Sequence, residues 1–527
     1  MKSVRPSSNS TNSNSPSVRS RKNDDGAAKE RSRILMLGWA FPAHLTGGVG
    51  TACQGLCRAL GQLGVGIDFI MSGPGEASAD DAVPEGVDAV ALAGKPDSVD
   101  KETHAPKYGR LADSWDAALE HARKSDEPMA SSFVASSVHP HMEFIRINVG
   151  LQPYQRPGES AEGGVAGTQV GAGTQAGAVP GHAGAASHEG QTPSATAPTA
   201  EERRRDLFAE VDCYTHQAIQ AAAGREFACV HAHDWMTFQA GMAIAEASGK
   251  PFIAHVHSTE YERTVHQIDE RIFEIERQAL MKADAVIAVS HMAREVLIRR
   301  YYIDESKITV IYNAVDCNDS NPAMRPANIV RDEKIVLFMG RMTLQKGPEY
   351  FLAAARKVLA VIRNVRFIMA GTGELLEKTM ALADQLGIAD RVLFPGFLRG
   401  DEVERAFRSA DLYVMPSVSD PFGIAALEAA SFDVPVLVSR QSGVSEVMRH
   451  VLKADFWDID DMADKIAAVL RHPPLQAALR KHGGFEVRNL RWSNAARQVV
   501  DVYQSMLSRQ TMSSREAATK RQAGNSA

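Results

Sequence analysis

Short apolar runs alternate with helical patterns along most of this chain, and each apolar run ends in a polar or glycine-rich loop. The first unit has an apolar run at 33–38, a glycine-rich loop at 46–50, a helical stretch at 51–63 and a second apolar run at 65–71. Gly64 stands just after the helical stretch, where a left-handed glycine commonly ends a helix. This order of strand, loop, helix and strand predicts a parallel sheet with helices on its faces.

The unit recurs in two series along the chain. We expect the later strands of the first series at 227–230, 251–256, 285–289 and 308–311, and the strands of the second series at 335–339, 365–370, 392–394, 412–415 and 434–438. Two such series predict an α/β architecture of two facing Rossmann-like domains. Because ligands bind at the carboxyl ends of the strands in such sheets, we expect the site in a deep cleft between the domains.

Shifts in composition set the expected domain boundaries. A first segment is rich in Ser, Asn, Arg and Lys, and a later one has almost no large apolar side chain with which to offset chain entropy. We also expect the C-terminal helices to pack back towards the first domain. The predicted parts are a disordered tail at 1–31, a first domain at 32–322 with a disordered insertion at 155–200, a second domain at 323–492, a C-terminal helix at 493–508 and a disordered tail at 509–527.

Charge and hydropathy argue against several kinds of partner. The chain has 58 Lys+Arg and 64 Asp+Glu, a net charge of −6, without the basic stripe that indicates nucleic acid or an anionic membrane surface. No apolar run approaches the ~20 residues of a membrane span. The first segment lacks the apolar core of a signal peptide, so we expect a cytoplasmic protein. The sequence does not indicate an oligomeric state.

Cysteines are sparse, which fits a reducing compartment; they stand at positions 53, 57, 213, 229 and 317. Cys53 and Cys57 lie on a predicted helix, and we interpret them as small buried hydrophobes because no Cys-x-x-Cys or histidine spacing accompanies them. His231-Ala-His233-Asp234 also has a poor ligand spacing for zinc. We therefore expect no metal site and no cofactor.

The segment P-S-V-S-D-P-F-G-I-A-A-L-E at 416–428 follows a predicted strand and opens an alanine-rich helix. The N-terminus of a helix offers unpaired N–H groups and the positive end of a dipole, both of which suit a phosphate. Two carboxylates, Asp420 and Glu428, flank this position. The alternative is purely structural: Asp420 caps the helix and Pro421 occupies its first position.

The loop G-R-M-T-L-Q-K-G at 340–347 places two cations at the head of a strand. Arg341 offers a planar fork to phosphate oxygens and Lys346 a compact charge, so together they suit a diphosphate leaving group. The alternative is a solvated basic loop, which the flanking glycines disfavour. Further on, Gly371-Thr372-Gly373 predicts only a tight turn before a helix.

Polar residues also follow the strands of the first series. His255 and His257 alternate at the end of a strand, and we expect them on opposite faces, with His257 at the cleft. The glycines at 46–50 let backbone amides approach a phosphate or a sugar, or simply form a turn. A serine nucleophile elbow and a Gly-x4-Gly-Lys-Ser/Thr phosphate loop are both absent from the sequence.

Taken in order, these motifs resemble those of the retaining GT-B nucleotide-sugar glycosyltransferases, the group 1 or family 4 type that includes the glycogen and starch synthases. The resemblance covers about residues 32–508, apart from the insertion. Each motif is weak alone, but five in the same order are specific. The motifs are G-W-A-F-P-A-H-L-T-G-G-V-G at 38–50, H-A-H-D-W at 231–235, H-V-H-S-T-E at 255–260, G-R-M-T-L-Q-K-G at 340–347 and P-S-V-S-D-P-F-G-I-A-A-L-E-A at 416–429.

The resemblance implies a role for each matching residue. Arg341 and Lys346 would bind the donor diphosphate, and Glu428 the ribose hydroxyls. His257 would stand near the reaction centre, on the C6 side of the sugar, and Asp234 would face the acceptor or sugar side. The other implied contacts are Gly47 and Gly48 at the diphosphate and sugar, backbone groups near Phe397 at the base, and the amides of Phe422, Gly423 and Ile424 at sugar hydroxyls and phosphate.

Asp420 is the one departure from the family pattern, which usually has Glu at this position. The aspartate is shorter by one methylene, so its carboxylate either falls short of a sugar hydroxyl or only caps the helix. A displacement on the ångström scale lowers a rate by roughly 100-fold. We therefore expect activity that is reduced, or altered in its choice of donor, with Asp420 still counted among the catalytic residues.

The resemblance implies a reaction as well as a site. A sugar, with glucose expected, would pass from a nucleoside diphosphate to a hydroxyl acceptor, with an α-glucan expected, and the anomeric configuration would be retained without a metal ion. The sequence leaves ADP, UDP and GDP open as the carrier. The rival readings are a nucleotide-sugar 2-epimerase, a phosphorylase and a non-catalytic module that binds nucleotide or glucan.

Overall fold

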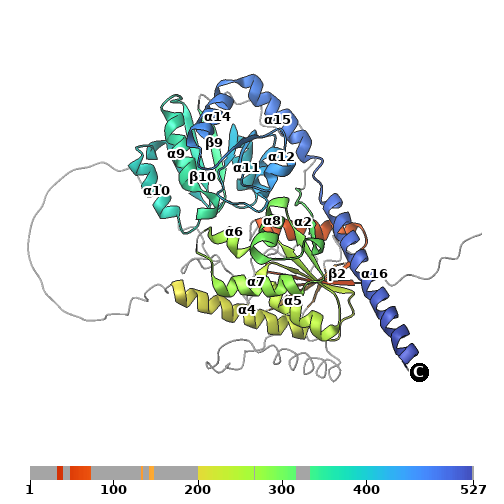
Figure 1. The fold of residues 1–527 in the computed structure, drawn as a ribbon. Helices are drawn as coiled ribbons and strands as arrows, with labels where there is room; N and C mark the ends of the chain where they lie inside the picture. The colour runs from red at the N-terminus through yellow and green to blue at the C-terminus, as the bar shows by residue number, and fades with distance from the viewer. Residues whose placement is uncertain are drawn as a thin grey trace, which may run out of the picture. The chain divides into compact units, whose positions relative to one another are not determined.

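The structure is a computed structural model that describes residues 33–39, 48–72, 132–134, 142–147, 200–265, 267–315 and 333–524. The predicted tail at 1–31 and nearly all of the predicted insertion at 155–200 lie outside these residues. The described residues form two sheets with helices between their strands (Figure 1). Within this part of the chain, no helix is both long enough and apolar enough to span a membrane.

The first sheet has eight strands in the order β3-β4-β2-β1-β5-β6-β7-β8, and only β3 runs antiparallel to its neighbour. Its strands are β1 (Arg33–Gly38), β2 (Gly66–Ser72), β3 (Ser132–Val134), β4 (Met142–Ile147), β5 (Cys229–His233), β6 (Phe252–Val256), β7 (Ala285–Ala288) and β8 (Ile308–Val310). The helices between them are α2 (Gly48–Gln62), α4 (Ala200–Ala222), α5 (Trp235–Ser248), α6 (Glu260–Thr264), α7 (Glu270–Lys282) and α8 (His291–Tyr301).

The second sheet has six parallel strands in the order β11-β10-β9-β12-β13-β14, which is the strand order of the doubly wound Rossmann fold. Its strands are β9 (Lys334–Met339), β10 (Val365–Ala370), β11 (Val392–Gly396), β12 (Leu412–Met415), β13 (Val436–Ser439) and β14 (Leu452–Ala454). The helices are α9 (Pro348–Leu359), α10 (Leu376–Gln385), α11 (Asp401–Ser409), α12 (Ile424–Ser431), α13 (Val444–Val447), α14 (Ile459–Arg471) and α15 (Pro473–Val487), and a 3-10 turn, η3, spans Leu344–Lys346.

Two parallel sheets of this kind confirm the predicted α/β class. The strands β10 and β12 coincide with their predicted bounds, whereas β3, β4 and β14 escaped the sequence analysis. β3 and β14 have three residues each, too few for a periodic signal, and β4 reads M-E-F-I-R-I, with charged residues between the apolar ones. Gly64 has the predicted left-handed backbone, with φ 77°, just after α2.

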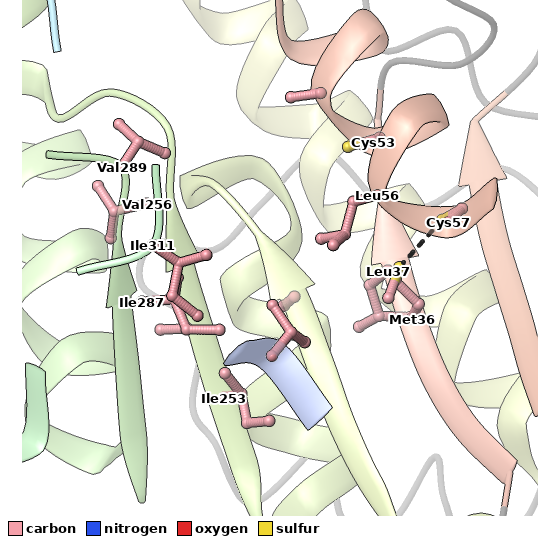
Figure 2. Close-up of a cluster of buried hydrophobic side chains, with 14 of the residues drawn as sticks. Met36, Leu37, Cys53, Leu56, Cys57, Ile253, Val256, Ile287, Val289 and Ile311 are labelled. Atoms are coloured by element: carbon pink, nitrogen blue, oxygen red, sulfur yellow. Dashed lines mark hydrogen bonds between the residues drawn. The ribbon is translucent and has the colours of Figure 1, made fainter. Parts of the chain in front are cut away.

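The core of the first sheet is built from strands that are buried on both faces, as expected when helices cover a parallel sheet. Figure 2 shows Met36 and Leu37 of β1 next to Leu56 and Cys57 of α2. Cys57 Sγ lies 3.4 Å from Met36 Sδ. Cys53 and Cys57 are each 1% exposed, so the prediction that both are buried is confirmed.

The C-terminal helix α16 (Trp492–Gly524) packs against the first sheet's elements, as predicted. The buried Tyr503 hydroxyl lies 2.7 Å from His231 Nδ1 of β5, and Gln510 Nε2 donates to the Gly249 carbonyl at 3.0 Å. The helix also continues through residues 509–524, which we predicted as a disordered tail. That segment is rich in Ala, Arg and Gln, which are strong helix formers.

Candidate functional site

In each sheet the strand order reverses at one place, and the carboxyl ends of the two strands at that place are where an open α/β sheet binds its ligands. The reversal falls between β1 and β5 in the first sheet, and between β9 and β12 in the second. The segments that follow these four strands carry most of the predicted site residues. Gly48 lies in the segment after β1, Asp234 after β5, Arg341 and Lys346 after β9, and Asp420 after β12.

Asp234 follows β5 in a backbone conformation that aspartate rarely adopts, with φ 61° and ψ 170°. Such a conformation costs about 1–3 kcal/mol and persists only where the surroundings enforce it. Here the Asp234 carboxylate accepts backbone hydrogen bonds from His257 at 2.7 Å and Ser258 at 3.3 Å, and its own N–H donates to the His255 carbonyl at 3.0 Å. These bonds join the end of β5 to the loop after β6. Burial raises the pKa of Asp234 to about 6, against the lowering effect of Arg263.

His257, just past β6, is buried, and its Nε2 lies 2.9 Å from Nδ1 of His233. Burial lowers the pKa of His257 to about 4, so its imidazole is neutral at physiological pH. The expectation that His255 and His257 point to opposite faces is wrong. Residues two apart on a strand share a face, and their ring centroids lie 4.4 Å apart, nearly parallel.

The loop after His257 is held by a buried ion cluster that the sequence analysis missed. Arg263 donates to the Ser258 carbonyl at 2.7 Å, and it forms ion pairs with Glu276 at 2.7 Å and Glu260 at 3.3 Å. Thr259 begins α6 with a capping box to Glu262, a pattern of threonine and glutamate three residues apart that was readable from the sequence. The cluster fixes the segment whose backbone N–H groups donate to the Asp234 carboxylate.

Two glycines position the loop that carries Arg341. Gly371 has φ 133° and Gly373 φ 152°, and a Cβ added at Gly371 would lie 1.9 Å from the Gly340 carbonyl oxygen. Backbone bonds join the two loops, from Gly340 N to Ala370 O at 3.0 Å and from Met342 N to Thr372 O at 2.8 Å. The glycines therefore do more than form the predicted turn: they let two loops pack backbone to backbone. Arg341 itself is half-buried.

Lys346 and Asp420 form an ion pair between the loops after β9 and β12, with 2.6 Å from Nζ to Oδ2. The Ser417 hydroxyl also donates to Asp420 Oδ2, at 3.3 Å. The two backbones are joined as well, because Val418 N donates to the Gln345 carbonyl at 2.9 Å. The sequence placed these cation and carboxylate residues in separate motifs, and the structure brings them together.

The structural alternative, in which Asp420 caps the following helix, is wrong. The helix α12 begins at Ile424, its cap is Gly423 with φ 99°, and no side chain bonds to its first amides. Asp420 instead pairs with Ser442 through the backbone, donating to Gln441 O at 2.9 Å and accepting from Gly443 N at 3.0 Å. The loop runs three residues further than the capping pattern assumed, so the carboxylate serves Lys346.

The remaining predicted residues lie around α12 and β11. Phe422 is buried before α12, and Glu428 lies half-buried on the helix without a hydrogen bond or ion pair of its carboxylate to any part of the chain that the structure describes. Burial raises the pKa of Glu428 to about 7. Phe397, after β11, is 47% exposed, and the Arg399 guanidinium lies 5.5 Å from its ring centroid. Gly47 lies outside the described residues.

Comparison with known proteins identifies the class. Residues 178–319 match the family model described as Glycosyltransferase Family 4, and residues 319–484 match Glycosyl transferases group 1. Over 291 residues the chain is 33% identical to an uncharacterized glycosyltransferase from Methanocaldococcus jannaschii, which covers 52% of this chain and 74% of that protein. The chain belongs to the group 1 glycosyltransferases, enzymes of the GT-B fold that use a nucleotide-sugar donor.

Two further similarities are to a relative of named activity and to a solved structure. A D-inositol 3-phosphate glycosyltransferase from Segniliparus rotundus is 26% identical over 327 residues, which cover 58% of this chain and 73% of that protein. Among solved structures, sucrose-phosphate synthase from Thermosynechococcus elongatus matches with a TM-score of 0.60 and 19% identity, covering 91% of this chain and 100% of that one. At that identity the likeness shows the fold alone.

Proposed function

We propose that this chain is a retaining, metal-independent hexosyltransferase that moves a sugar from a nucleoside-diphosphate carrier to a hydroxyl of a carbohydrate acceptor. The observation that carries the proposal is the ion pair between Lys346 and Asp420, in the loops that follow β9 and β12, where the strand order reverses. The Asp420 carboxylate holds the Lys346 ammonium group in place. A diphosphate carries more negative charge than this carboxylate, so Lys346 can bind the diphosphate when it arrives. Arg341 lies in the same loop as Lys346 and supplies the second cation.

The roles of the other residues in this proposal follow the family resemblance. The Glu428 carboxylate accepts hydrogen bonds from the ribose hydroxyls. Backbone groups near Phe397 contact the base. The backbone amides of Phe422, Gly423 and Ile424 bind the sugar and the phosphate. Gly47 and Gly48 approach the diphosphate and sugar. Asp234 orders the loop of His257, which stands beside the reacting carbon. Because His257 is neutral, it serves as a hydrogen-bonding partner of the sugar and leaves the cationic role to Arg341 and Lys346.

Catalysis in this proposal is electrostatic. The bond from the anomeric carbon to the phosphate oxygen breaks as the acceptor oxygen forms its bond on the same face, and the leaving phosphate takes the acceptor proton. Preorganised cations and amides stabilise such a leaving group. Each such protein group typically contributes 10²–10³-fold to the rate. No metal ion takes part in this step, so a chelator does not lower the rate.

Glucose is our first candidate for the sugar and an α-glucan for the acceptor, with D-inositol 3-phosphate as the second acceptor because a similar protein carries that name. The cysteines that the structure describes are free, which supports a reducing, cytoplasmic setting for the reaction. The test is a panel of ADP-, UDP- and GDP-linked sugars against both acceptors, scored for release of the nucleoside diphosphate. Acceptor-dependent release supports transfer, and NMR of the product tests retention at the anomeric carbon.

Two outcomes would contradict the proposal. Release of nucleoside diphosphate with a free 2-epimerised sugar, without any acceptor, indicates an epimerase. Calorimetric binding of nucleotide with neither hydrolysis nor transfer for any donor indicates a binding module.

A further inference from the structure

Four buried imidazoles stack at the carboxyl ends of β5 and β6. The ring centroids of His231 and His233 lie 4.6 Å apart, and those of His255 and His257 lie 4.4 Å apart. Hydrogen bonds cross between the strands, with 3.1 Å from His231 Nε2 to His255 Nδ1 and 2.9 Å from His233 Nδ1 to His257 Nε2. The four side chains are at most 8% exposed, so water does not satisfy their remaining polar atoms from bulk solvent.

These contacts leave part of the hydrogen-bonding capacity unused. Among the described residues, His233 Nε2, His255 Nε2 and His257 Nδ1 have no partner. A neutral imidazole has one N–H and one lone pair, and His233 and His257 share one proton between their facing nitrogens. Whichever tautomer is present, one of their two outer nitrogens is a bare lone pair and the other an N–H without an acceptor. Each such buried group lacks the hydrogen bond that it would make in water, which is unfavourable.

A thiol lies next to this pair of histidines. Cys53 of α2 is 1% exposed, and its Sγ and one nitrogen from each of His233 and His257 all lie within 4.8 Å of one another. Figure 2 shows Cys53 and Cys57 along the same helix, with only Cys57 joined by a dashed line to Met36. Cys53 Sγ has no hydrogen bond to any residue that the structure describes.

A second group of possible ligands is less suited to an ion. His231, His233 and His255 also bring three nitrogens within 4.8 Å of one another. However, both ring nitrogens of His231 are already engaged, by Tyr503 at 2.7 Å and by His255 at 3.1 Å. Binding an ion through His231 would break one of these buried hydrogen bonds. Binding by Cys53, His233 and His257 also breaks one, between the two imidazoles, but it gains a thiolate ligand for the ion.

We propose that Cys53, His233 and His257 bind a Zn²⁺ ion. One thiolate and two imidazoles form a typical ligand set for zinc, which prefers a tetrahedral arrangement with Zn–S of about 2.3 Å and Zn–N of about 2.0–2.1 Å. These lengths place the ligand atoms roughly 3.3–3.6 Å apart, so side-chain rotations of about an ångström close the site. The thiol releases its proton to solvent on binding. Each neutral imidazole gives its lone pair to the ion and keeps its single N–H on its other nitrogen. Binding therefore breaks the hydrogen bond between His233 Nδ1 and His257 Nε2.

Zinc at this position is expected to inhibit the enzyme. It would join α2, which follows the glycine-rich loop, to His257 and so withdraw the imidazole that we place beside the reacting sugar. The inhibition rests on the proposed function, whereas the binding does not. A binding measurement and an activity measurement therefore fail separately.

The binding experiment uses the full chain without an affinity tag, stripped with chelator and desalted, and titrated with Zn²⁺ against a chromophoric indicator. We expect one tight equivalent per chain in the wild type. Cys53→Ala is expected to weaken it by about 100-fold. Cys57→Ala is the matched control, since Cys57 lies one turn further along the same buried helix face and belongs to neither ligand group, and it is expected to bind like the wild type.

Co²⁺ provides a readout of the ligands themselves. A tetrahedral thiolate site gives a sulfur-to-cobalt charge-transfer band, which we expect in the wild type and in Cys57→Ala and not in the conservative variant Cys53→Ser. Absence of a tight equivalent in the wild type, or equal affinity and an unchanged band in the Cys53 variants, overturns the proposal. A zinc-bound chain that transfers sugar at the full rate refutes the inhibition and leaves the site intact.

Discussion

Lys346 Nζ lies 2.6 Å from Asp420 Oδ2, and this pair joins two loops that come from the strands on either side of the reversal in the second sheet. The carboxylate is 5% exposed and the ammonium group's side chain 23%, so the pair is open on the lysine side. A buried carboxylate holds the cation in place before a substrate arrives. Asp420, which is one methylene shorter than the glutamate usual in the family, thus forms an ion pair with Lys346. Asp420 is therefore the first residue to substitute.

Asp420→Glu lengthens the carboxylate by one methylene within this pair. We expect turnover or donor preference to change by about tenfold or more, since ångström-scale shifts at a reacting centre have effects of this size. Steady-state rates on the donor panel measure it. Asp458→Glu, at the exposed cap of α14, is the control for the same chemical change. Unchanged turnover and donor preference in Asp420→Glu would show that the length of this side chain does not matter.

Arg341→Ala and Lys346→Ala each remove a cation from the proposed diphosphate site. We expect kcat to fall by about 10²–10³-fold, the usual effect of losing one preorganised electrostatic contact. Thermal unfolding is expected to shift only slightly in Arg341→Ala, because Arg341 is only partly buried. It is expected to shift more in Lys346→Ala, which leaves the buried Asp420 carboxylate without its cation. Near-wild-type turnover in both variants refutes this site.

Gly371→Ala tests whether the loop contact positions Arg341. A Cβ there lies 1.9 Å from the Gly340 carbonyl oxygen, at φ 133°, so we expect a loss of at least about 3 kcal/mol in the free energy of unfolding, and a lower kcat. Gly387→Ala is the matched control, with φ 67° but nothing within 4 Å of the added Cβ. It isolates backbone strain, which costs about 1–2 kcal/mol. Equal losses in the two variants, measured in urea, would show that the loop contact contributes nothing.

Arg263→Met leaves two buried carboxylates, Glu260 and Glu276, without their cation. Removing one partner of a buried ion cluster typically costs 3–5 kcal/mol, and Tyr301 still bonds to Glu276. We therefore expect a marked loss of stability in urea unfolding. Arg277→Met is the control, because Arg277 forms an exposed pair with Glu274 on the same helix as Glu276. A loss in Arg263→Met no larger than in the control would mean that the cluster does not hold the fold.

Glu428→Gln separates donor binding from stability through pH. Burial raises the pKa of Glu428 from 4.5 to about 7, so its contribution to stability is fully present below pH 4.5 and is lost as the pH rises through 7. The glutamine variant is therefore expected to be about 1–2 kcal/mol more stable than the wild type at pH 8 and equal to it at pH 4.5.

The same substitution is expected to weaken donor binding. A ribose hydroxyl donates more strongly to an ionised carboxylate, so the donor KM of the wild type is expected to fall as the pH rises from 6 to 8. In Glu428→Gln the donor KM is expected to be about tenfold higher than in the wild type and independent of pH across this range. Initial rates measure it. A wild-type KM that is independent of pH contradicts the ribose role.

The sequence was sufficient for the fold because its strands are continuous apolar runs bounded by turn residues, as at 365–370 and 412–415. It also placed Asp234, Arg341, Lys346 and Asp420 at strand ends, since the strand before each of them was recognised. The sequence did not predict which residues of different loops contact each other. Neither the pairing of Lys346 with Asp420 nor the approach of Gly371 to Gly340 follows from spacing, because both depend on which strands become neighbours.

The histidines show the limit in another way. Their shared face follows from the period of a strand, and the prediction for His255 and His257 was wrong on that point. The approach of Cys53 to His233 could not be predicted, because α2 and β5 are distant in the sequence and meet only through packing. The Glu428 carboxylate has no partner among the described residues. This also could not be predicted, because it depends on how the neighbouring elements pack around the side chain.

Tyr503 reaches from α16 to His231, so the first sheet acquires its last polar partner from a helix near the end of the chain. During synthesis, β5 and β6 leave the ribosome long before α16 does. His231 Nδ1 therefore lacks the Tyr503 hydroxyl as a partner until α16 has been made. A chain that stops before Tyr503 has every residue of both sheets and still cannot complete the histidine stack. Truncation before Tyr503 is therefore expected to leave His231 Nδ1 without its hydroxyl partner while both sheets stay intact.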